Sequence, residues 1–303
     1  MKASTLLPLL ILILVIAATS TGVFHTDTRP RIEQTTVRGE HATFQGSGLY
    51  RYDPAAVARE GIVWDVVDLV VTVPLFLITI LLTGRGSLRA RLVLPGFLFY
   101  FFYRYLMFAT MSALNFMYPV YVLIFALSAI AFFMAIHSID INSLPGSFSE
   151  KFPRKFFIGF GFGAGIMITL LWSRLILSIL ISGKFPDELA GITTLETQAI
   201  DLGMVVPLMI ATSILLLQKS PWGYLLSAVV VTFGFIMCIV LPAWIAVPAI
   251  QDGTIRPIEA IPFLSLCAAG LVLAEMFLRS IRNPLITSTR LPRLREGHPS
   301  ALR

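Results

Sequence analysis

Residues 64–75 read WDVVDLVVTVPL and residues 198–208 read QAIDLGMVVPL, and these two stretches decide the fold. Each stretch opens a long apolar run with an acid and carries a proline six residues further on: Asp68 with Pro74, and Asp201 with Pro207. The offset between the two acids, and between the two prolines, is 133 residues. The shared spacing predicts two related halves, each organised around an apolar helix with an acid near one end.

The composition identifies the class of protein. Of the 303 residues, 56% are hydrophobic and only 13% are charged, and the mean hydropathy is +0.83. A soluble domain would carry about 25% charged residues, so the chain is predicted to be a polytopic membrane protein. The net charge of +6 comes mainly from basic residues that flank apolar runs. It therefore indicates membrane orientation, and we expect no nucleic-acid partner.

Eight apolar runs approach the roughly 20 residues that a helix needs to cross the hydrocarbon core. The first, residues 5–22, fits either a spanning helix or a signal peptide with small residues at 17–20 for cleavage. A spanning helix would make the repeat complete. The other seven runs lie at about 61–82, 92–111, 117–136, 156–182, 198–217, 223–246 and 260–280.

The predicted fold is an all-α membrane protein with eight transmembrane helices in two four-helix repeats. Because each repeat has an even number of spans, the two copies are predicted to be parallel. Residues 35–44 resemble two short strands around an Arg38-Gly39 turn, which predicts a small external hairpin. The expected order is a first transmembrane helix or signal peptide (1–22), an external cap (23–60), a first half (61–138), a cytoplasmic linker (139–155), a second half (156–281) and a disordered basic tail (282–303).

Basic residues predominate at one set of helix ends, which predicts that this set is cytoplasmic. They are Lys2, Arg85, Arg89, Arg91, Lys151, Arg154, Lys155, Lys219 and the arginines of the tail. Both termini would then be inside the cell, with the protein in the cytoplasmic membrane. The tail could contact anionic lipid head groups or remain a solvated segment that sets the topology, so membrane lipids are the partners we expect.

Four charged residues are expected within the membrane, in its outward-facing half: Asp68, Arg104, Arg174 and Asp201. Each costs about 3 kcal/mol on an insertion scale, so they should face the bundle interior and form pairs. The helices of Asp68 and Arg104 are consecutive, and so are those of Arg174 and Asp201. We therefore predict one Asp–Arg pair in each half, with Asp65 one helical turn from Asp68 on the same face.

Two interpretations of these charges remain open. In the first, they line an outward-open cavity that binds a small polar or charged solute, and Tyr103 and Tyr105 contribute hydroxyl groups beside Arg104. In the second, they are buried ion pairs that only fix the order of the helices. Glu275 and Arg279 are four residues apart near the cytoplasmic end of the last helix, which is typical of a local salt bridge.

Several kinds of chemistry find no support in the sequence. The four histidines, His25, His41, His137 and His298, are scattered outside the apolar runs, so we expect no metal or haem site within the membrane. The two cysteines, Cys238 and Cys267, lie inside apolar runs and indicate buried thiols. The glycines at 159, 161, 163 and 165 have the small-residue spacing of packed helices. We expect no cofactor.

Several segments together resemble a family of uncharacterised prokaryotic multi-spanning integral membrane proteins. They are GLYRYD at 48–53, DVVDL at 65–69, VPL at 73–75, RGSLR at 85–89, DLGMVVPL at 201–208 and PWGY at 221–224. The resemblance covers residues 40 to about 240. It implies a multi-spanning protein of the cytoplasmic membrane and implies no activity and no catalytic residue.

Three functions are compatible with the sequence. The first is a transporter or ligand-binding protein whose cavity is built from Asp65, Asp68, Arg104, Arg174 and Asp201. The second is a membrane-embedded enzyme that acts on a lipid-linked substrate with an aspartate as general base. The third is a structural or accessory subunit. A continuous cavity favours transport, a lateral opening beside clustered carboxylates favours an enzyme, and tight Asp–Arg pairs without a cavity favour the structural role.

Overall fold

The structure is a computed structural model that describes residues 3–149, 152–186, 189–252 and 257–282. Seven helical segments of this part of the chain are long and apolar enough to cross a membrane, which confirms a multi-pass membrane protein. The eighth expected run, residues 260–280, lies in helix α11 (Pro257–Ser280), which is not among the seven. That span remains a prediction, and so does the disordered tail, of which residues 283–303 lie outside the described residues.

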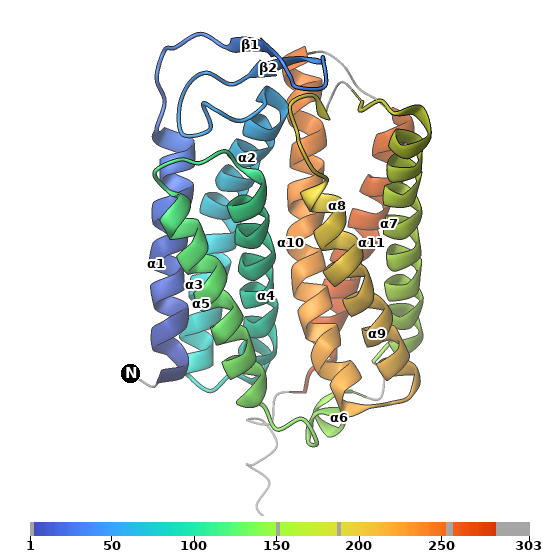
Figure 1. The fold of residues 1–303 in the computed structure, drawn as a ribbon. Helices are drawn as coiled ribbons and strands as arrows, with labels where there is room; N and C mark the ends of the chain where they lie inside the picture. The colour runs from blue at the N-terminus through green and yellow to red at the C-terminus, as the bar shows by residue number, and fades with distance from the viewer. Residues whose placement is uncertain (1–2, 150–151, 187–188, 253–256, 283–303) are drawn as a thin grey trace, which may run out of the picture.

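The helices form one bundle (Figure 1). The first five spans along the chain are α1 (Ala3–Phe24), α2 (Ala55–Val67) with its continuation α3 (Val73–Gly84), α4 (Leu88–Met111), α5 (Tyr118–His137) and α7 (Arg154–Ser182). They are followed by α8 (Glu196–Ile200) with its continuation α9 (Val206–Leu217), by α10 (Pro221–Asp252) and by α11, and a short helix α6 (Leu144–Ser147) connects α5 with α7. Helices α4 and α10 pack against each other and join the two sides of the bundle.

Helix α1 is built into the bundle. It packs against α2, α3 and α5, and the side chains of Ile11, Val15 and Ala18 are buried. Near its end, Gly22 lies directly against the carboxylate of Asp65 in α2. The helix therefore covers a polar site of the neighbouring span.

Two of the spans are interrupted by a π-helical turn, and in both the turn begins at the aspartate that lies six residues before the proline. Asp68–Thr72 joins α2 to α3, and Asp201–Val205 joins α8 to α9. In each, the N–H of the valine before the proline donates to the carbonyl of the aspartate five residues earlier. Proline has no N–H and its ring collides with the carbonyl four residues before it. A wider turn accommodates this collision without breaking the span.

The turns after α3 and α9 also match. Gly86 and Lys219 both have a positive φ, of 84° and 57°. The next residue in each turn, Ser87 or Ser220, donates its N–H five residues back, at 3.0 and 2.9 Å. This is the hydrogen bond of a Schellman motif, which reverses the chain tightly into the next helix. The same backbone path therefore recurs in the two stretches that the sequence singled out.

The segment between α1 and α2 contains a two-stranded antiparallel hairpin of β1 (Ile32–Thr35) and β2 (His41–Phe44). A hairpin was predicted over 35–44, and β1 lies a few residues earlier than expected because the turn extends from Thr36 to Glu40. Arg38 of this turn donates to the carbonyl of Ile192 at 2.6 Å. The hairpin thus contacts the loop between α7 and α8, at the end of the bundle opposite the N-terminus (Figure 1).

Candidate functional site

Arg104 lies between two carboxylates at the centre of the first half. Its Nη2 donates to Asp65 Oδ1 at 2.5 Å, and its Nε is 2.5 Å from Asp68 Oδ2. The outer oxygens accept hydrogen bonds from tyrosines: Asp65 Oδ2 from Tyr50 and Asp68 Oδ1 from Tyr100. The expected contact between Asp68 and Arg104 is therefore present, and Asp65 shares the same guanidinium.

Aromatic rings close this triad off from its surroundings. The Arg104 side chain is 0% exposed, and those of Asp65 and Asp68 are 3% and 0% exposed. The guanidinium carbon lies 4.3 Å from the ring centroid of Phe108 and 5.1 Å from that of Trp64, which is cation–π geometry. Tyr105 was expected to offer its hydroxyl to a site, but it presents its ring to Arg104, and its hydroxyl has no partner in the described part of the chain.

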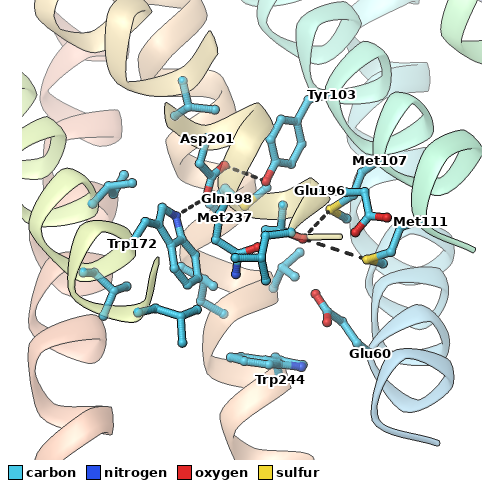
Figure 2. Close-up of a pocket in the computed structure, with 18 of the residues that line it drawn as sticks. Glu60, Tyr103, Met107, Met111, Trp172, Glu196, Gln198, Asp201, Met237 and Trp244 are labelled. Carbon is cyan, nitrogen blue, oxygen red and sulfur yellow. Dashed lines mark hydrogen bonds between the residues drawn. The ribbon is translucent and has the colours of Figure 1, made fainter. Parts of the chain in front are cut away.

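The expected pair in the second half is absent. Asp201 accepts hydrogen bonds from the Tyr103 hydroxyl and the Trp172 indole N–H, both at 2.9 Å (Figure 2). Arg174 is exposed and forms no ion pair with Asp201. Trp172 and Arg174 are two residues apart on α7, so their side chains point to roughly opposite faces of the helix. With Trp172 turned inward, Arg174 is directed outward.

Beside Asp201 lies a cavity of about 490 Å³, between α2, α4, α7, α8 and α10. Its wall is mostly apolar and includes five methionines, at positions 107, 111, 167, 209 and 237. The polar groups are few, and Figure 2 shows most of them converging on this space: Glu60, Tyr103, Trp172, Glu196, Gln198 and Asp201. The loop between α7 and α8 also contributes, so the cavity reaches the end of the bundle nearest the hairpin, and along α7 it extends as far as Phe160.

The structure divides the predicted site residues into three groups. Asp201 and Tyr103 line the cavity. Asp65, Asp68, Arg104 and Tyr105 surround the sealed triad and do not line it. Arg174 lies on an exposed helix face. The interpretation that one cavity is lined by all the charged residues is therefore wrong. Asp201 lines a cavity, whereas Asp65 and Asp68 are buried around Arg104.

Sequence reasoning missed Glu60, Met237 and Trp244 of the cavity wall. Glu60 was assigned to the cap segment 23–60, but α2 begins at Ala55, so Glu60 lies in the second turn of this helix. Its carboxylate accepts a long hydrogen bond of 3.4 Å from the indole of Trp64. The acid four residues before a tryptophan, at the start of an apolar run, was the signal that could have placed it on the helix.

In the cap, Asp53 is a buried acid that the sequence did not single out. Its side chain accepts a hydrogen bond from the N–H of Ala113 at 2.6 Å, and its Oδ2 has no partner in the described part of the chain. Burial raises the pKa of Asp53 from 3.8 to about 7, although the Ala113 hydrogen bond acts in the opposite direction. The carboxyl group is therefore protonated in the folded cap at mildly acidic pH.

This raised pKa predicts a pH dependence of stability. Between about pH 4 and 7 the unfolded chain has lost the Asp53 proton while the folded chain keeps it. The contribution of Asp53 to the free energy of unfolding therefore falls as pH rises through this range and is constant above it. Asp53→Asn keeps the acceptor for Ala113 and removes the titration. We expect the free energy of unfolding of the variant, relative to that of the wild type, to be higher at pH 8 than at pH 4 by at least about 1 kcal/mol. Thermal unfolding in detergent across this range measures it.

Asp27→Asn is the matched control, because Asp27 is an exposed acid of the same segment between α1 and α2. It should leave the pH dependence of the unfolding temperature as in the wild type. Identical pH profiles for the wild type and Asp53→Asn would contradict the account of Asp53.

Comparison with known proteins identifies no relative. No protein-family model, no curated protein and no solved structure matches the chain. The resemblance to a prokaryotic membrane-protein family therefore remains a prediction, and the membrane class is established by the seven spans.

Proposed function

We propose that this protein binds a small solute in the cavity beside Asp201, as a transporter or a solute receptor of the membrane. One observation supports this above all: a cavity of about 490 Å³ whose apolar wall holds a few convergent polar groups around Asp201. Binding sites for small molecules typically have volumes of about 300 to 1,000 Å³ and this kind of lining. The carboxylate is held in place by Tyr103 and Trp172, so it presents a fixed charge or hydrogen-bond acceptor.

The sealed triad serves this function indirectly. Because no part of Asp65, Asp68 or Arg104 lines the cavity, a solute in it does not meet them. They hold α2 against α4, and α4 carries Tyr103 and Met107 on its cavity side. The triad therefore positions one wall of the proposed site.

The proposal includes the predicted architecture of two four-helix repeats. The π-helical turn, the proline after it and the Schellman turn recur at an offset of 133 residues, which supports two parallel four-helix halves that arose by duplication. In this arrangement α11 is the eighth span, α1 is retained, and both termini are cytoplasmic. The cavity then opens toward the outer side of the membrane.

The test is to fill the cavity and to measure binding. Gly234 lines it and has open space around its α-carbon; Gly163 also has open space, but on an exposed face of α7. A panel of amines, amino acids, carboxylates, sugars and nucleosides is screened for compounds that raise the unfolding temperature. We expect a compound that stabilises the wild type and Gly163→Leu and not Gly234→Leu. Equal stabilisation of both variants would place the binding elsewhere and contradict the proposal.

A further inference from the structure

The two matching stretches surround their aspartates with different side chains. At the offset of 133 residues, Asp65 corresponds to Gln198 and Arg104 corresponds to Met237. Asp68 and Asp201 occupy the same place, at the start of the π-helical turn. In the first half, the guanidinium of Arg104 therefore lies beside the aspartate, and in the second half a neutral thioether stands at the corresponding position.

The consequence is a carboxylate without a cation. The two partners of Asp201, a tyrosine hydroxyl and an indole N–H, are both neutral donors. Asp201 and Met237 both line the cavity (Figure 2). Where Asp68 has the guanidinium of Arg104 beside it, Asp201 therefore has open space. The neighbouring Gln198 is 7% exposed and lines the same space. Its amide has no hydrogen-bond partner within the described residues, so its oxygen is free to accept from a ligand.

The rest of the lining has the same electrostatic character. Three carboxylates, of Glu60, Glu196 and Asp201, line the cavity, and its described lining contains no lysine, arginine or histidine. Aromatic side chains, including those of Trp172 and Trp244, complete the wall. Carboxylates and aromatic faces both attract cations, and the attraction is stronger where water is excluded.

We infer that the cavity takes an organic cation with an apolar body, and that its ammonium or guanidinium group occupies the place beside Asp201 that Arg104 occupies beside Asp68. The inference rests on the proposed function and adds the chemical class of the solute. The methionine-rich wall contacts the apolar body, since methionine adapts to irregular shapes. Anions are excluded, because the described lining offers them no positive charge.

A cysteine at position 237 tests the inference. Met237→Cys is made in a background with Cys238→Ser and Cys267→Ser, because both native thiols also line the cavity. The purified protein reacts with three methanethiosulfonates: a cationic one (trimethylammonioethyl) and an anionic one (sulfonatoethyl) of similar size, and a smaller neutral one (methyl) that reports access to the cavity. Each rate is divided by the rate of the same reagent with free 2-mercaptoethanol. We expect the cationic reagent to be favoured over the anionic one at least tenfold.

The outcomes separate the two levels of the proposal. In an added Asp201→Asn variant, the preference for the cation should fall at least fivefold while the neutral reagent reacts as before. Access of the neutral reagent without a preference for the cation would overturn the cation inference and leave the binding cavity standing. No reaction with the neutral reagent would show that the cavity is closed and would overturn the proposed function as well.

Discussion

Replacing Arg104 by methionine should lower the free energy of unfolding by about 3 to 5 kcal/mol, the cost of breaking a buried ion pair by removing one partner. The substitution leaves Asp65 and Asp68 as two uncompensated carboxylates in a site where all three side chains are at most 3% exposed. We expect little folded protein after detergent extraction and a much lower unfolding temperature. Intrinsic tryptophan fluorescence during heating measures the unfolding temperature.

Arg279→Met is the control for this experiment. Arg279 pairs with Glu275, but the two side chains are 79% and 59% exposed, and exposed pairs contribute about 0 to 1 kcal/mol. The same chemical change should therefore have almost no effect there. Adding Asp65→Asn and Asp68→Asn to Arg104→Met should recover most of the lost stability, because the tyrosine hydroxyls still find acceptors and no buried charge remains. A stable Arg104→Met protein would contradict the structural role of the triad.

Adding one methyl group at Gly22 should cost about 3 kcal/mol, at the upper end of overpacking effects. A Cβ atom there would overlap Asp65 Oδ2 and would come within 3.1 Å of the Tyr50 hydroxyl. The carboxylate cannot move aside, because Arg104 holds one of its oxygens and Tyr50 the other. We expect Gly22→Ala to be strongly destabilised, as measured by its unfolding temperature.

Gly163→Ala is the matched control, since nothing lies within 4 Å of a Cβ atom at that position. Alanine is favoured over glycine in a helix by about 1 kcal/mol, so this variant should be as stable as the wild type or more stable. A Gly22→Ala protein that also gains stability would show that α1 does not press against Asp65.

The sequence predicted the membrane class, a small two-stranded hairpin and the contact of Asp68 with Arg104. The last followed because a short turn at residues 85–87 joins the two helices, so acids and bases on them are brought together. The second pair could not be predicted in the same way. Helix α7 is apolar on all sides, and nothing in its pattern tells whether Trp172 or Arg174 faces the bundle.

The cavity was beyond sequence reasoning for a different reason. Its volume depends on how closely the helices approach each other, and this is decided locally by small residues. A Cβ atom at Gly161 would overlap the hydroxyl of Ser213, and one at Gly165 would lie 3.4 Å from Cγ1 of Ile210, so α7 packs closely on α9. Farther toward the hairpin the larger side chain of Trp172 meets Asp201, and the open space lies beside it. A pattern of apolar residues does not report such differences in spacing.

The measurement that tests the central claim most directly is a double-mutant cycle between Met237→Arg and Asp201→Asn. If Asp201 is a carboxylate whose cation comes from a ligand, an arginine side chain at position 237 supplies that cation from within the chain. The account predicts that Met237→Arg preserves or raises the unfolding temperature when Asp201 is present and lowers it when Asp201→Asn is added, with an interaction energy of about 1 to 3 kcal/mol. An equal loss of stability from Met237→Arg in both backgrounds would contradict it.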